Sequence, residues 1–93
     1  MNLFPFSFYR VSGHSMEPTL KNGQVVVADY LSFRFRPPQV GDIILFDFGS
    51  KKLIKRITQI QERGYLVAGD NRADSLKIDL VVKDKVIAKI FNF

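Results

Sequence analysis

The sequence predicts a mostly β domain, built as a small antiparallel barrel or folded-over sheet with at most a short helix. Three observations support this prediction. Short apolar and β-branched runs recur along the chain, and turns that contain glycine or proline separate them. No apolar stripe with helical periodicity persists over about twelve residues, as an amphipathic helix would require. Short strands joined by such turns are typical of antiparallel barrels and folded sheets.

The first two strands are expected at residues 24–28 and 42–48. The run at 24–28 is rich in valine and follows Asn22-Gly23, a dipeptide that favours tight turns. The run at 42–48 follows Pro37-Pro38. Successive prolines exclude a helix that runs through this point.

Three further strands are expected in the second half of the chain. Residues 52–61 form one extended run, Arg63-Gly64 turns it into residues 65–68, and a last strand covers about residues 85–91. The one helical candidate is a turn or two that begins near Ser15, with Pro18 early in it.

Length and composition indicate a single domain over residues 1–93. A chain of this size buries about 60–70% of the surface that its unfolded form exposes, so its core must be compact. Residues 1–10 are the candidate for a flexible or membrane-surface aromatic segment. No cysteine is present, which excludes disulfides, thiolate zinc sites and a thiol nucleophile.

Charge and hydropathy limit the classes of partner. The net charge is +5, but the basic residues are spread from Arg10 to Lys89, so no nucleic-acid partner is expected. The apolar stretch at residues 3–9 is broken by Pro5 and Ser7 and is far shorter than the ~20 residues of a spanning helix. We therefore expect a cytoplasmic or peripherally membrane-associated protein.

Rings alternate with guanidinium groups in the segment Phe33-Arg34-Phe35-Arg36. An extended chain would give this segment one apolar and one cationic face. Two interpretations stay open. The rings pack in the core, or they form a rim that dips into an anionic bilayer surface.

The segment around Ser15 has the composition of a nucleophile turn. Gly13 lets the chain bend sharply just before the serine, so that backbone N–H groups converge where an oxyanion would sit. A serine-rich turn that caps a short helix would have the same composition. This structural interpretation stays open on the local sequence alone.

A serine nucleophile needs a general base. The one histidine, His14, directly precedes Ser15, and neighbouring side chains of an extended chain point to opposite faces. Lysine is the other base used with serine, and burial lowers the ordinary lysine pKa of about 10.4. Strand alternation predicts that Lys55 shares a face with Leu53 and Ile57. The alternative is a lysine whose stem packs while its ammonium group reaches water.

Four segments resemble, in order, the motifs of the type I signal peptidases and their relatives. Residues 12–20, with the core Ser-Met-x-Pro-Thr-Leu, are similar to the nucleophile motif, and residues 41–46 are similar to a structural motif. Lys55-Arg56-Ile57 resembles the motif that supplies the base, and Gly69-Asp70-Asn71 resembles the motif that closes the site. In size the chain is most similar to a small relative, the maturation protease of nickel-containing superoxide dismutase.

The resemblance implies a mostly antiparallel β catalytic domain of the signal-peptidase type with a Ser-Lys dyad. Ser15 would attack the scissile carbonyl to form an acyl-enzyme. Lys55 would take its proton and then activate the hydrolytic water. Gly13 and Met16 would belong to the oxyanion and substrate-binding surface, and the Ser15 backbone N–H would donate to the oxyanion. The resemblance implies no metal or cofactor.

The resemblance also implies the supporting residues Asp70, Asn71, Asp74 and Ser75. An ungapped alignment from the Gly-Asp-Asn motif places Ser75 where the family has a serine that orients the lysine. An alignment from the last strand backwards instead matches Asp74-Ser75 to the family's Asp-Ser-Arg, with a shortened loop and Leu76 in place of the arginine. We favour the second alignment, because the rest of the chain then runs without gaps.

The sequence therefore predicts a cofactor-free serine endopeptidase that cleaves an N-terminal leader or signal segment from a protein substrate. Peripheral contact with a membrane would suit such substrates. The second hypothesis is a catalytically silent β-domain that binds a peptide strand or another partner.

Overall fold

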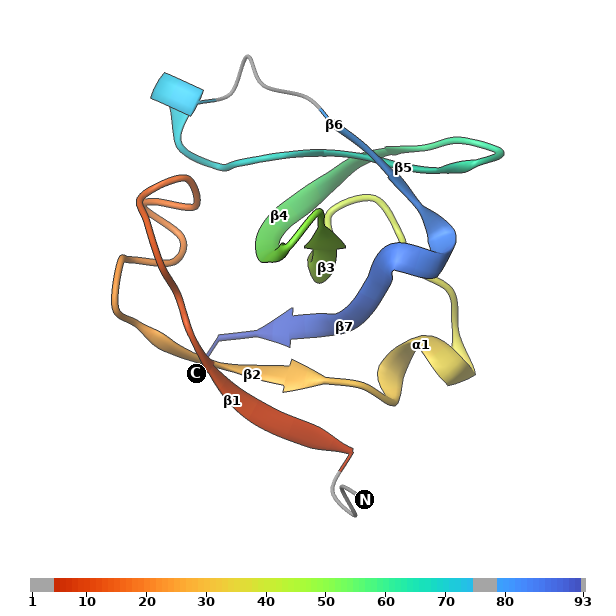
Figure 1. Cartoon of the computed structure of the whole chain (residues 1–93), viewed down its shortest axis with the longest axis horizontal. Coiled ribbons are helices and arrows are strands. Elements are labelled where there is room, and N and C mark those ends of the chain that lie inside the picture. The colour runs from red at the N-terminus through yellow and green to blue at the C-terminus, as the bar shows by residue number, and fades with distance from the viewer. Residues whose placement is uncertain (1–4, 75–78, 93) are drawn as a thin grey trace.

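The computed structural model describes residues 5–74, with the backbone alone at Asp74, and residues 79–92. Its strands form one curled antiparallel sheet in the order β1-β2-β7-β3-β4-β5-β6 (Figure 1). One short α-helix and two 3-10 turns complete the described elements. This architecture confirms the predicted mostly β fold. The bounds are β1 Phe6–Arg10, β2 Val25–Asp29, α1 Ser32–Phe35, β3 Ile43–Phe48, β4 Lys51–Ile60, β5 Gly64–Ala68, η1 Arg72–Asp74, β6 Asp79–Val82, η2 Lys83–Lys85 and β7 Val86–Phe91.

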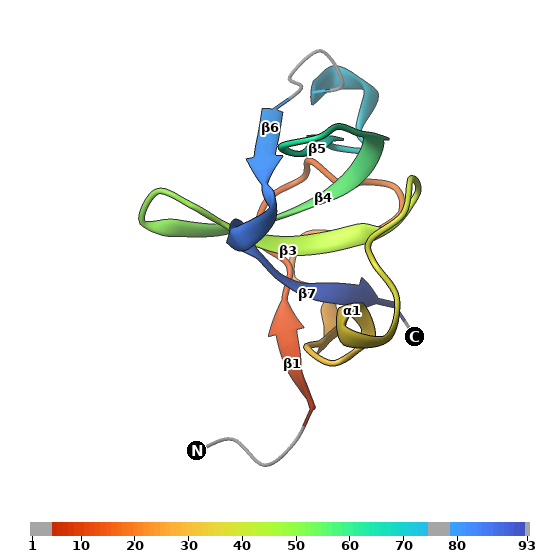
Figure 2. The ribbon, with the colours of Figure 1, turned by 90° about the vertical axis from the view of Figure 1, so that its right-hand side faces the viewer.

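The sheet curls along its strand order. Figure 2 shows β5 and β6 at one end of the molecule and β1 at the other, with β3 and β7 between them. The register shifts between Leu45 and Phe46, where β3 meets β7, and between Ile57 and Gln59, where β4 meets β5. Such irregularities increase the local twist, which helps a sheet to fold over on itself.

All five predicted strands are present close to their expected bounds, whereas β1 and β6 were not predicted. β1 pairs with β2 along its whole length, yet Phe6 and Phe8 point outward while Ser7 and Tyr9 are half-buried. Two apolar side chains of β1 therefore lie on its outer face, where an antiparallel strand usually carries polar residues. β6 has only four residues and contributes a single buried side chain, Val81.

The α-helix of the described residues lies at Ser32–Phe35 rather than after Ser15. Asp29 explains its position, because its Oδ1 accepts the backbone N–H groups of Leu31 (2.8 Å) and Ser32 (3.0 Å) at the helix start. Residues 15–19 form turns instead. No helix within the described ranges is long and apolar enough to span a bilayer.

The helical backbone changes the arrangement expected for residues 33–36. Phe33 packs against the core, whereas the ring of Phe35 is 82% exposed. Because residues two apart lie on nearly opposite sides of a helix, the two rings do not share a face. The expectation of one apolar and one cationic face was wrong, since it assumed an extended chain.

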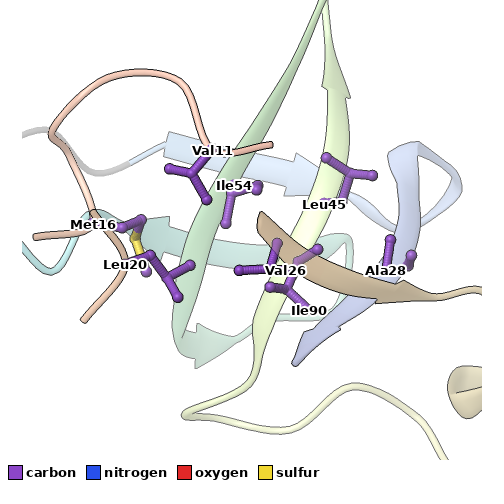
Figure 3. Packing of buried hydrophobic residues seen from close by; sticks show 9 residues of the cluster. Val11, Met16, Leu20, Val26, Ala28, Leu45, Ile54 and Ile90 are labelled. Atoms are coloured by element: carbon purple, nitrogen blue, oxygen red, sulfur yellow. The ribbon is translucent and has the colours of Figure 1, made fainter. Parts of the chain in front are cut away.

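Two hydrophobic clusters fill the curl of the sheet. The first joins Met16 and Leu20, from the turns after β1, to side chains of four strands (Figure 3). Met16 and Leu20 are 1% and 0% exposed, and burying such side chains stabilises a fold by roughly 1.5–3 kcal/mol each. This packing fixes the segment that carries Ser15 to the sheet. The second cluster contains Ile44, Phe46, Ile57, Tyr65, Val67 and Val81.

Candidate active site

The turn before Ser15 depends on Gly13. Its φ of 92° lies in the left-handed region, where a side chain would strain the backbone. The Gly13 N–H donates to Asn22 Oδ1 at 2.9 Å, and the Val11 N–H donates to the Gln24 carbonyl at 2.8 Å. These bonds join the turn to the residues just before β2. They therefore fix the position of the segment that carries Ser15, which follows β1 in the chain.

Ser15 and Lys55 line the same small pocket, of about 50 Å³. One wall comes from the chain around the nucleophile turn and the other from β4. The structure therefore brings together three of the predicted site residues, Ser15, Met16 and Lys55, while Gly13 shapes the turn beside the pocket. The lining residues are Tyr9, Val11, Ser12, Ser15, Met16, Lys52, Leu53, Ile54 and Lys55.

The β4 wall of this pocket is an open strand edge. Residues Lys52–Lys55 pair with β3 on one side. The pairing of β4 with β5 begins only at Arg56, which leaves the other edge of Lys52–Lys55 unpaired within the described chain. Unpaired N–H and C=O groups along an edge are the features that accept an added peptide strand.

Lys55 lies on the strand face predicted for it. Leu53 packs against the second hydrophobic cluster and Ile57 belongs to it, while the intervening Ile54 belongs to the first. Lys55 itself is half-buried. Within the described residues, neither Ser15 Oγ nor Lys55 Nζ forms a hydrogen bond or ion pair, so both groups remain available to a third partner in the pocket.

His14 is engaged away from Ser15. Its Nδ1 lies 3.0 Å from Glu17 Oε2, and its side chain is 66% exposed. The hydrogen bond from His14 lowers the pKa of the Glu17 carboxyl. This geometry agrees with the expectation that His14 does not act on its neighbour.

Asn71 and Gly69 hold the nucleophile turn from the other side. The Asn71 backbone N–H donates to the Ser15 carbonyl at 2.9 Å, and its Nδ2 donates to the His14 carbonyl at 2.9 Å. A Cβ added at Gly69 would lie 2.4 Å from the Ser15 carbonyl oxygen. Only a glycine allows the two backbones to approach this closely, so Gly69 and Asn71 position Ser15.

Asp70, which lies between Gly69 and Asn71 in the sequence, forms a network of charged hydrogen bonds. Its Oδ1 accepts Arg56 Nε at 2.9 Å, and its Oδ2 accepts Arg56 Nη2 at 2.8 Å and Thr19 Oγ1 at 2.6 Å. Arg56 Nη1 also donates to the Gly41 carbonyl at 2.7 Å. The hydrogen bonds from Arg56 hold the pKa of Asp70 below its usual range, and those to Asp70 raise the pKa of Arg56.

This network unites all four motifs found in the sequence. Sequence reasoning gave Asp70 a supporting role without naming its partners, Arg56 and Thr19. The Lys-Arg pair of β4 and the Pro-Thr-Leu of the nucleophile motif were the available signals. Asp74 ends η1, but its side chain lies outside the described residues, as does Ser75, so the expected support from these two stays a prediction.

Comparison with known proteins matches the chain to a family model described as "Signal peptidase, peptidase S26", over residues 1–60. This match includes Ser15 and Lys55 and ends before Gly69. Signal peptidase I of Bacillus caldolyticus is 40% identical over 58 residues, which cover 61% of this chain and 32% of that protein. A probable signal peptidase I-1 of Synechocystis sp. is 50% identical over 36 residues, which cover 39% of this chain and 18% of that protein.

The matched part of the chain therefore spans about a third or less of the length of these two relatives. The family model, in contrast, covers more than half of the 93 residues. On this match, the chain belongs to the signal peptidase family, peptidase S26.

Proposed function

We propose that this chain is a serine endopeptidase that cleaves a leader or signal segment from a protein substrate, with Ser15 as nucleophile and Lys55 as general base. The observation that carries the proposal is the shared pocket of Ser15 and Lys55 beside an open strand edge. Family membership supports the same assignment, because the matched region contains both residues.

In the proposed reaction, Ser15 Oγ attacks the scissile carbonyl carbon while its proton passes to Lys55 Nζ. The C–N bond then breaks, the leaving amine takes that proton, and an acyl-enzyme ester remains on Ser15. Water attacks the ester with Lys55 again accepting a proton, and Ser15 regains its hydrogen as the acid product leaves. Lys55 must be neutral to accept the proton of Ser15.

The oxyanion of each tetrahedral intermediate needs a hydrogen-bond donor. The backbone N–H of Ser15 donates to no acceptor among the described residues, which leaves it free for this task. Gly13 has no side-chain hydroxyl to donate to the oxyanion, so in this mechanism the oxyanion accepts hydrogen bonds from the backbone alone.

The substrate would bind as an added β-strand along residues 52–55 of β4. Main-chain hydrogen bonds to an open edge give affinity without regard to sequence, and the pocket then selects the side chain beside the scissile bond. The pocket is small, with a volume of about 50 Å³, and we expect it to favour small side chains there. Small residues next to the cleaved bond are therefore part of the proposal.

Peripheral contact with an anionic membrane is also proposed, because aromatic and basic groups meet on one open surface. Phe6, Phe35 and Phe91 line a hollow together with the exposed Arg36. Exposed rings beside cationic side chains suit the interface of an anionic bilayer.

The proposal is tested by substitution at the two reactive groups. Ser15→Ala and Lys55→Ala should each abolish cleavage of a leader-peptide substrate while the unfolding midpoint stays close to that of the parent chain. Lys51→Ala is the matched control, since Lys51 lies exposed on the same strand and does not line the pocket. Cleavage retained in a pure Lys55→Ala protein would contradict the role of Lys55. A folded parent chain that binds the peptide without cleaving it would favour the alternative, a silent β-domain.

A further inference from the structure

A separate hollow, of about 280 Å³, lies between α1 and the segment formed by η2 and β7. Two cations line it, Arg34 and Lys83, whereas none of its lining residues is an aspartate or glutamate. Both side chains are exposed, and within the described residues neither forms a side-chain hydrogen bond or an ion pair. The hollow therefore carries a positive charge that no ion pair of the described chain neutralises.

Tyr65 is an independent sign of a ligand in this hollow. It is 6% exposed, packs in the second hydrophobic cluster and also lines the hollow. Its hydroxyl forms no hydrogen bond within the described residues, although the hydroxyl of a buried tyrosine usually has a partner. Every fully buried side-chain nitrogen or oxygen of those residues does have a partner, so the Tyr65 hydroxyl is not sealed in the core and reaches the hollow.

The Tyr65 hydroxyl is suited to donate to an anion. Burial raises the pKa of this phenol above its ordinary value of 10.0, so the group keeps its proton at neutral pH. The hollow thus combines one neutral donor with a guanidinium group and an ammonium group. All three are donors toward an anion, and the two cations have no acceptor function at all.

This set of donors fits a phosphate group better than a carboxylate. A guanidinium group binds phosphate oxygens through two parallel hydrogen bonds, and lysine adds a compact point charge. A phosphate monoester carries a charge of about −1.5 to −2 at pH 7, which balances two cations, whereas a carboxylate balances only one. The rings of Tyr30 and Phe33 line the same hollow, and they provide an apolar wall for the organic part of an ester.

We propose that the hollow lined by Arg34, Tyr65 and Lys83 binds the phosphate group of a phosphate monoester, carried either by a soluble molecule or by a lipid headgroup. Arg34 and Lys83 neutralise the phosphate, and the Tyr65 hydroxyl donates a hydrogen bond to one of its oxygens. This hollow shares no lining residue with the pocket of Ser15, so the inference stands apart from the proposed peptidase activity.

The first test titrates phenyl phosphate against the full chain by calorimetry. Tyr65→Phe removes the hydroxyl without changing the charge, and it should weaken binding about 2- to 10-fold while the unfolding midpoint stays close to that of the parent. Arg34→Gln/Lys83→Gln should weaken binding by at least about 10-fold. Arg36→Gln/Lys85→Gln is the matched control, since it removes the same charge from exposed positions outside this hollow and should leave the Kd within about twofold of the parent value.

Vesicles distinguish the two sources of the phosphate group. The parent chain and Tyr65→Phe are co-sedimented with phosphatidylcholine vesicles with and without phosphatidic acid, whose headgroup is a phosphate monoester. Binding of phenyl phosphate that depends on Tyr65 supports a soluble ester, whereas Tyr65-dependent binding confined to phosphatidic acid vesicles supports a lipid headgroup. The inference would be overturned if the parent binds neither probe, if both double variants lose affinity equally, if Tyr65→Phe binds like the parent, or if benzoate binds as tightly as phenyl phosphate.

Discussion

Gly69→Ala changes one atom at the point where the closing motif meets the nucleophile turn. The new Cβ would lie 2.4 Å from the Ser15 carbonyl oxygen and 3.3 Å from the Ser15 Cβ. Real Cβ atoms essentially never approach closer than 3.0 Å, so the backbones must separate by at least 0.6 Å (3.0 − 2.4). Gly69 does not have a positive φ, and the effect is therefore steric rather than conformational.

Such a shift moves the proposed nucleophile itself. Displacing a reacting group by about 1 Å can reduce the rate about 100-fold, so a shift of this size should reduce kcat by roughly 10- to 100-fold. Overpacking should also lower the free energy of unfolding by about 1–3 kcal/mol. Steady-state cleavage kinetics and denaturant unfolding measure the two effects separately.

Gly64→Ala is the matched control. Its added Cβ would meet the Val81 carbonyl oxygen at an even shorter distance, but that contact joins β5 to β6 and lies outside the pocket of Ser15. It should therefore lower stability by a similar amount while the folded protein keeps its kcat. A Gly69→Ala enzyme with the same kcat as Gly64→Ala would refute the role of this contact in positioning Ser15.

Two further predictions concern the charge network and the exposed rings. Asp70→Asn should lower the free energy of unfolding by about 1–2 kcal/mol at neutral pH, because it leaves Arg56 without its charged partner in a partly exposed site. The fold lowers the pKa of Asp70 from its ordinary 3.8, so this stabilisation is present above pH 4 and lost in stronger acid. Unfolding curves of parent and variant should therefore converge as the pH falls below 4, and a constant difference would contradict the ion pair. Phe35→Ser should weaken co-sedimentation with vesicles containing anionic lipid and leave the stability nearly unchanged, because the ring is 82% exposed; equal binding would exclude Phe35 from the membrane contact.

The five predicted strands were accessible from sequence because their patterns are local. β-Branched runs bounded by Asn22-Gly23, the prolines or Arg63-Gly64 determine where the chain extends and turns. β1 and β6 were missed although Phe, Tyr and Val, which favour strands, make up much of both segments. The exposed Phe6 and Phe8 of β1 contradict the usual inward placement of aromatic rings.

The candidate site, like the fold, could be predicted from the sequence only in part. Strand alternation and the exclusion of other bases pointed to Lys55, and the structure puts it in one pocket with Ser15. The hold on the nucleophile turn was not predictable, because Asn71 reaches the His14 carbonyl across 57 residues of sequence. Asp29 Oδ1 accepts the backbone N–H groups of Leu31 and Ser32 at the start of the helix at residues 32–35, and the alternation of rings and guanidinium groups gave no sign of this contact.

The most direct test of the Ser15–Lys55 mechanism is to trap the acyl-enzyme. The intact mass of the parent chain should rise by the mass of one acyl group after incubation with a serine-acylating inhibitor, and peptide mapping should place it on Ser15. Lys55→Ala should show no such adduct on the same timescale, because nothing then takes the proton from Oγ. Acylation of Ser15 at the parent rate in Lys55→Ala, or no acylation of the folded parent chain, would contradict the account.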